Sequence, residues 1–283
     1  MEERRRFYTT VLADHLRKHR QMALVSGPRQ VGKTTACRSI SDAYLNWDNM
    51  DDRRRLLRGP AALAEALQLD LLRAEPPIAV LDELHKYSKW KSLLKGFFDT
   101  YGERVRLIVT GSSRINIFRQ GSDSLMGRYF FYRMHPWSVA ECLRTEIPFH
   151  EIQPPAEVST ADWDALWEHG GFPEPFLRRD TRFTRRWRSL RQEQLSREDL
   201  REVAQVADLG TMETLVQLLA NEVGSNSFTR VLRGKFKFRW IQSSAGSTCL
   251  LGCTMDLWFA RGSRMLLRLL GKNRNGFCAT GVG

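Results

Sequence analysis

The chain has 283 residues, 42% apolar and 27% charged, which is enough for one large globular domain or two modest ones. Neither a run of about 18 apolar residues nor a signal-like apolar start is present, so we expect no membrane span and a cytoplasmic location. Five cysteines without metal-ligand pairs agree with a reducing compartment, and the net charge of +12 comes mostly from the last part of the chain.

The first elements are predicted to form a phosphate-binding loop. A basic amphipathic helix over residues 2–20 leads into a short apolar strand over residues 22–25. The pattern G-x-x-x-x-G-K-T follows from Gly27 to Thr34, and residues 35–40 can continue as a helix. In this order of strand, glycine loop and helix, backbone N–H groups and the helix N-terminus face phosphate oxygens.

This loop is predicted to bind ATP with Mg²⁺. Gly27 and Gly32 allow the backbone to curl, so that its N–H groups point inward. Lys33 would reach the β- and γ-phosphates, and the Thr34 hydroxyl would ligate Mg²⁺. The residues predicted to contact the nucleotide are Gly27, Pro28, Arg29, Gln30, Val31, Gly32, Lys33, Thr34 and Thr35.

An acid pair follows the next buried strand. Residues 43–47 are predicted to be the second strand, residues 51–75 helical, and residues 77–81 the third strand. Asp82, at the carboxyl end of that strand, would lie near the Thr34-bound Mg²⁺. Glu83 would polarise water for attack on the γ-phosphate, which favours hydrolysis over transfer to a small molecule.

Two more candidate catalytic residues lie further along the chain. After a helix over residues 88–101, a strand from Arg104 ends in the polar run 110–113, where Ser112 could bond the γ-phosphate or the attacking water. Arg128, before the aromatic run of a fifth strand at 128–132, is predicted to stabilise transition-state charge, in the same chain or from a neighbouring subunit. Arg29 and Arg114 are weaker candidates for that role, and His85 is expected to make only a local contact.

The alternation of strands and helices predicts an α/β fold, a P-loop NTPase parallel sheet flanked by helices. We assign residues 1–135 to this ATPase domain, because four prolines break the pattern between residues 135 and 160. Residues 136–228 are predicted to start a smaller, mainly helical and incomplete second domain, with helices over 162–169 and 184–223.

Several segments together resemble a group of prokaryotic AAA-type ATPases. They read LVSGPRQVGKTT, IAVLDELHK, LIVTGSS, SLMGRYFFYRMHPWS and HGGFPEPF, and the resemblance covers roughly residues 5 to 228. It implies ATP, Mg²⁺ and hydrolysis for Lys33, Thr34, Asp82 and Glu83. It also implies a C-terminal domain of unknown function that resembles a winged helix followed by a nuclease-like fold.

Three functions compete at this point. The leading one is an ATP hydrolase whose turnover switches a C-terminal effector module, with DNA or protein as that module's partner. A P-loop small-molecule kinase does not explain Glu83 beside Asp82. A basic DNA-binding protein without turnover rests only on the charge of the tail. A trans-acting Arg128 would require a homo-oligomer.

The tail departs from the rest of the chain. From Phe228 onward it carries ten Lys/Arg against one acidic residue, with three of the five cysteines and eight of the twenty glycines. Codons can be chosen for residues 271–283 that, read from each third base, give KEPKWFLRDWS, which resembles the family at the corresponding place. We therefore predict that residues 229–283 are translated out of frame and have no native fold, and that the frame changes near codons 229 to 235. The alternative is a genuine, unusual basic tail.

Overall fold

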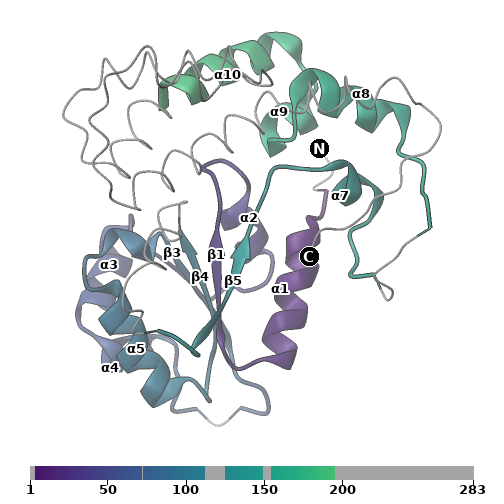
Figure 1. Cartoon of the computed structure of the whole chain (residues 1–283). Coiled ribbons are helices and arrows are strands. Elements are labelled where there is room, and N and C mark those ends of the chain that lie inside the picture. Colours follow the sequence, from purple (N-terminus) through teal and green to yellow (C-terminus); the bar gives the residue numbers. More distant parts are fainter. Residues whose placement is uncertain (1–3, 72, 112–124, 149–153, 195–283) are drawn as a thin grey trace, which may run out of the picture. The chain divides into compact units, whose positions relative to one another are not determined.

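The computed structural model describes residues 4–71, 73–111, 125–148 and 154–194 (Figure 1). The chain divides into two compact units, which are Met1–His135 with Arg144–Ile147, and Pro136–Leu143 with Pro148–Gly283. The predictions for Ser112, Arg114 and the tail lie outside the described residues. None of the helices within these ranges is long and apolar enough to cross a membrane.

The first unit is built on a parallel sheet. Its strands in the described residues are β1 (Met22–Ser26), β2 (Tyr44–Asn46), β3 (Ile78–Asp82), β4 (Arg106–Gly111) and β5 (Tyr129–Arg133). They lie in the order β2-β3-β4-β1-β5, and every neighbouring pair is parallel. Ser26 pairs with Gly111, and Asn46 pairs with Asp82, so the carboxyl ends of four strands meet at one edge. The predicted α/β parallel sheet is thereby confirmed.

Side chains of the central strands alternate between two apolar cores. Met22 and Leu24 of β1 belong to one core, whereas Ala23 and Val25 belong to the other. This alternation follows from the two-residue period of a strand, and a parallel sheet needs helices on both faces. All five residues of β1 are buried, as expected for such a sheet.

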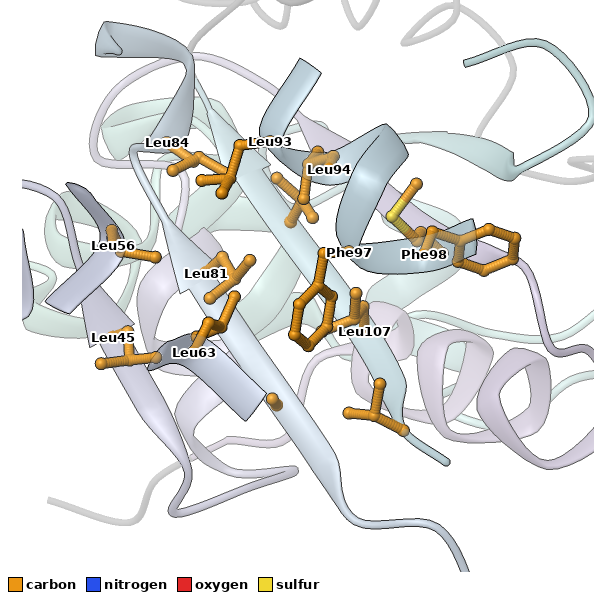
Figure 2. Packing of buried hydrophobic residues seen from close by; sticks show 14 of the residues in the cluster. Leu45, Leu56, Leu63, Leu81, Leu84, Leu93, Leu94, Phe97, Phe98 and Leu107 are labelled. Carbon is orange, nitrogen blue, oxygen red and sulfur yellow. The ribbon is translucent and has the colours of Figure 1, made fainter. Parts of the chain in front are cut away.

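Three helices supply the first core (Figure 2). They are α3 (Met50–Leu57), α4 (Pro60–Ala66) and α5 (Trp90–Tyr101). Apolar residues recur along α5 at helical spacing, and Leu94 and Phe97 are fully buried against strand residues such as Leu81 and Leu107. The helix predicted over 51–75 is thus two helices, because Gly59 has a positive φ of 96° and Pro60 begins the second.

Two helices supply the second core on the opposite face. α1 (Phe7–Lys18) buries Leu12 and Leu16, and α2 (Lys33–Arg38) buries Ala36 and Cys37. A 3₁₀ turn, η1 (Leu84–Lys86), follows β3 directly. The start of α2 and the end of β3 are thus held in place by apolar packing on both faces of the sheet.

The second unit is helical in its described part. It contains α7 (Val139–Leu143), α8 (Thr160–His169), α9 (Pro173–Arg178) and α10 (Thr181–Gln194). Trp137 and Phe176 stack with ring centroids 5.6 Å apart, in a core shared with Ala165 and Leu166. The Trp137 backbone N–H donates to the Gly171 carbonyl at 2.6 Å, and a Cβ at Gly171 would meet the Trp137 carbonyl. The Gly-Gly turn is therefore a close packing point of this unit.

Candidate nucleotide site

The glycine loop joins β1 to α2, and two of its glycines are required by the backbone. Gly32, at the N-cap of α2, has a φ of 95°, which L-residues rarely adopt. A Cβ at Gly27 would lie 2.4 Å from the Met134 carbonyl oxygen, too close for any side chain. The loop is thus curled and packed directly against the chain that follows β5.

Lys33 lies within the curve of this loop. It is the first residue of α2, and its side chain is buried. Its Nζ donates to the Gly27 and Pro28 carbonyls, each at 2.8 Å. The loop therefore concentrates an ammonium group, backbone N–H groups and a helix N-terminus in one place, a combination that suits phosphate oxygens.

Asp82 connects four elements at the carboxyl edge of the sheet. One of its oxygens, Oδ2, accepts hydrogen bonds from Thr34 Oγ1 on α2, at 2.9 Å, and from the Tyr44 hydroxyl on β2. The other, Oδ1, accepts from the Thr110 hydroxyl on β4. Asp82 itself is buried. Three hydroxyls from separate elements thus fix the orientation of one carboxylate.

This arrangement fits the oxygen chemistry of Mg²⁺. The Thr34 hydroxyl and the Asp82 carboxylate are hard oxygen ligands, and a P-loop metal takes its remaining ligands from phosphate and water. Within the described residues, no group of three or more His, Cys, Asp and Glu side chains could hold a metal alone. Thr34 and Asp82 are therefore the residues that would hold the ion together with a bound nucleotide.

Tyr44 remains a hydrogen-bond donor to Asp82. Burial, the hydrogen bond with Asp82 and the negative charge of Asp82 raise the pKa of Tyr44 far above its ordinary value. The guanidinium of Arg38 lies 4.2 Å from the centre of the Tyr44 ring, which fixes the ring from the α2 side. The phenol is therefore protonated at neutral pH and holds Asp82 from the direction of β2.

Glu83 occupies a strained position next to Asp82. Its φ of 55° is left-handed, an unfavourable conformation for a residue with a side chain. Its N–H donates to Thr110 Oγ1 at 3.4 Å, and its Oε2 lies 3.3 Å from Lys86 Nζ. The backbone thus turns sharply at the end of β3, which directs two consecutive acids into different surroundings.

The surroundings of Glu83 alter its acidity. Burial raises the pKa of Glu83 above the ordinary glutamate value, and the positive charges of Lys86 and Lys33 only partly oppose this. Lys86 also donates to Asp48 Oδ2 at 2.6 Å. Burial lowers the pKa of Lys86, but its hydrogen bond with Asp48 and the two nearby carboxylates raise it more, so its charge is maintained. Lys86 is thus a permanent cation shared between Glu83 and Asp48.

An arginine near the start of the chain forms hydrogen bonds with the glycine loop. The buried Arg6 donates to the Val31 carbonyl and to the His135 carbonyl, both at 2.6 Å. Val31 belongs to the glycine loop, and His135 follows β5. Arg6 therefore links the loop to the segment that follows β5 and places a positive charge next to the loop.

The structure does not bring Arg128 to the glycine loop within one chain. The Met22 N–H donates to the Arg128 carbonyl, so Arg128 lies at the amino edge of the sheet. The five residues of β1 lie between that edge and the loop, which corresponds to a separation of about 16 Å along the strand. Arg128 instead forms a bidentate pair with Asp99 of α5, at 2.6 and 3.0 Å. A catalytic role within the same chain therefore has no support, and only a role in a neighbouring copy stays a prediction.

Sequence reasoning missed Tyr44, Asp48, Lys86 and Arg6 as parts of this site. Tyr44 begins a short strand, and only the strand order places it beside β3. Lys86 lies three residues after Glu83, and a helical turn after the strand brings residues at that spacing together. Their contact could therefore have been predicted from the sequence. Arg6 gave no signal, because its partners are 25 and 129 residues away.

Comparisons with protein families agree with this geometry. Residues 19–143 match the family described as AAA domain. Residues 160–248 match a domain of unknown function, DUF8612. The chain is thus similar to an AAA domain over residues 19–143 and to a domain of unknown function over residues 160–248. The winged-helix and nuclease-like parts stay predictions.

Solved structures with weak overall similarity to this chain include the following three. The Aeropyrum pernix Orc1 protein in complex with DNA is 15% identical, with 93% of this chain and 81% of that chain covered and a TM-score of 0.39. A Thermotoga maritima DNA polymerase III gamma subunit-related protein is 12% identical, with 97% and 94% covered and a TM-score of 0.32. The S. cerevisiae Hsp104–ADP complex is 12% identical, with 94% of this chain and 38% of that chain covered and a TM-score of 0.37. No curated protein sequence matches this chain significantly.

Proposed function

We propose that this protein is a Mg²⁺-dependent ATP hydrolase. The observation that carries the proposal is the 2.9 Å hydrogen bond between Thr34 and Asp82, which joins the glycine loop to the end of β3 beside Glu83. Bound Mg²⁺ would supply charge neutralisation for the β- and γ-phosphates. Lys33, the first residue of α2 after the loop, would bind those phosphates directly.

The chemistry assigned to the chain itself centres on Glu83. Its carboxylate accepts a proton from water while the water oxygen bonds to the γ-phosphorus. The bond from that phosphorus to the β,γ-bridging oxygen breaks, and ADP leaves with the electron pair. Thr110, which contacts both Asp82 and the Glu83 N–H, keeps the two acids in fixed relative positions. Ser112 would contact the γ-phosphate or the water.

The acid pair also favours hydrolysis over the kinase alternative. A small-molecule kinase must exclude water and hold an acceptor, whereas Glu83 lies next to the metal-binding aspartate, where an attacking water is expected. We further propose that turnover acts as a switch for the C-terminal domain. If Arg128 completes the site of a neighbouring copy, the protein works as a homo-oligomer.

ATP binding and turnover by the full chain test this function. We expect Mg²⁺-dependent ADP formation that EDTA abolishes. Lys33→Ala should weaken ATP binding about 100-fold, because it removes charge-assisted hydrogen bonds to the phosphates. Lys95→Ala, at an exposed position of α5, is the matched control and should bind like the wild type. Equal ATP affinity in the Lys33→Ala variant and the wild type would exclude this site.

The out-of-frame tail stays a separate prediction. The match to DUF8612 runs to residue 248, past the predicted change near codons 229 to 235. An out-of-frame segment has no reason to match a family, so this range counts against a change that early. The coding DNA decides the point. A one- or two-base slip that restores the family reading frame would support the prediction, and its absence would refute it.

A further inference from the structure

The arginines of α9 and α10 fall into two groups. Residues 173–194 contain seven arginines and no lysine, against three acidic residues. Some of these arginines have a structural role inside the second unit. The others do not, and the distinction can be made from their contacts.

Four of the seven make contacts within the unit. Arg178 pairs with Glu174 at 3.2 Å, and Arg179 pairs with Asp162 at 2.7 Å. Arg188 donates to the Glu168 carbonyl at 2.6 Å. Arg191 is buried. These side chains join α8, α9 and α10, so their charge is explained by the fold.

The other three, Arg182, Arg185 and Arg186, are exposed. Across the described part of the chain, their side chains form no hydrogen bond and no ion pair. Asp180, just before α10, accepts the Arg182 and Phe183 backbone N–H groups, at 2.7 and 3.2 Å. Asp180 thus caps the start of α10 and is already used there.

The spacing of these arginines places them on one face of α10. Positions i, i+3 and i+4 of a helix are neighbours, about 5–6 Å apart. The buried residues Thr184 and Trp187 are adjacent to them in sequence and define the opposite, inward face. The outward face of α10 is therefore a cluster of three cations, and Glu193 is the helix's one acidic residue.

We propose that this arginine face of α10, defined by Arg182, Arg185 and Arg186, binds the phosphate backbone of duplex DNA. Arginine presents a planar fork of donors that matches phosphate oxygens. A preformed α-helix is admitted by the major groove of B-form DNA, whereas the deep, narrow groove of duplex RNA does not admit it. Contacts to phosphates alone give affinity without sequence preference.

Other partners fit this face less well. Single-stranded nucleic acid is held by exposed aromatic side chains, but Trp187 is buried and packs on Phe172, with ring centroids 4.8 Å apart. A membrane surface requires an apolar face beside the cations. On α10 the exposed large apolar residue is Leu190, which is insufficient for such a face.

The test compares two variants with equal loss of charge. R182Q/R185Q/R186Q removes the arginine face, and R54Q/R55Q/R58Q removes three exposed arginines from the α3 region. Binding of a short fluorescein-labelled DNA duplex is measured by anisotropy over a range of salt concentrations. The basic tail is present in both variants, so the difference between them isolates α10.

We expect the α10 variant to bind duplex DNA at least tenfold more weakly than the α3 variant. The slope of log K against log salt should fall by about 0.9 for each phosphate that the variant no longer neutralises. R182K/R185K/R186K keeps the charge and should recover most of that slope, which excludes misfolding as the cause. Unchanged thermal melting of all variants provides a second check.

Several results would overturn the proposal. They are no duplex binding by the wild type, equal weakening in the α3 and α10 variants, or tighter binding of single-stranded DNA or duplex RNA than of duplex DNA. The proposal is independent of hydrolysis, because Mg²⁺-dependent turnover without DNA should be the same in the α10 variant and the wild type. Failure of one function therefore leaves the other testable.

Discussion

The carboxyl edge of the sheet and the outward face of α10 both concentrate polar side chains, but in opposite ways. At the sheet edge, Asp82 is buried and accepts hydrogen bonds from three hydroxyls on three elements. On α10, Arg182, Arg185 and Arg186 are exposed and have no ion pair among the described residues. The first arrangement depends on exact positions, whereas the second depends mainly on summed charge.

This difference predicts how each region responds to substitution. Groups that share one carboxylate act as a unit, so their effects are large and not additive. Exposed cations that contact phosphates act nearly independently, and salt weakens each of them. A single conservative substitution at the sheet edge should therefore reduce ATP turnover more strongly than a single substitution on α10 reduces DNA affinity.

The largest effect is expected at Glu83. Glu83→Gln removes the base and leaves the metal-binding Asp82 in place, so kcat for ATP hydrolysis should fall by about 10²- to 10⁴-fold. ATP affinity should change little. Steady-state ADP formation and a separate ATP-binding titration measure the two quantities. Glu103→Gln, at an exposed position, is the control. If kcat of the Glu83→Gln variant matches that of the control, Glu83 is not the base.

A smaller effect is expected at Tyr44. Tyr44→Phe removes one of the two hydrogen bonds at Asp82 Oδ2, and a bond to a charged group contributes about 1.5 kcal/mol or more. Turnover at low Mg²⁺ should therefore fall about tenfold and recover partly at high Mg²⁺. Titration of turnover against Mg²⁺ tests this, with Tyr101→Phe as the control. A loss that extra Mg²⁺ does not relieve would assign Tyr44 another role.

Much of this fold was predictable from sequence because its signals are local. The apolar runs, the glycine loop and the acids after β3 each lie within a few residues. What could not be predicted depends on strand order, which brings Tyr44 of β2 and Thr110 of β4 to the same carboxylate. Long-range packing likewise brings Arg6 to the glycine loop.

The position of Arg128 could have been inferred more fully from the sequence. Arg128 was predicted to begin a strand, and the start of a parallel strand lies at the edge opposite the carboxyl ends. The same prediction that placed the aromatic run in the sheet therefore already placed Arg128 away from the glycine loop. The pair with Asp99 then gives it a structural partner at that edge.

The smallest expected effect is a change in pH dependence at Lys86. Burial raises the pKa of Glu83, and the positive charge of Lys86 opposes that rise. Lys86→Met should therefore raise the Glu83 pKa further. Because the base must be ionised, turnover is lost as pH falls through that pKa, so the acidic limb of the kcat profile should move to higher pH.

A charge-retaining variant separates this effect from a change of shape. Lys86→Arg keeps a cation near Glu83 and Asp48, and its acidic limb should stay close to that of the wild type. Well above the Glu83 pKa, all three proteins hold Glu83 ionised, so their rates should converge there. An acidic limb that moves to lower pH in the Lys86→Met variant would mean that Lys86 does not act on Glu83 through its charge. Convergence at high pH with the predicted shift would instead identify Lys86 as a residue whose positive charge lowers the pKa of Glu83.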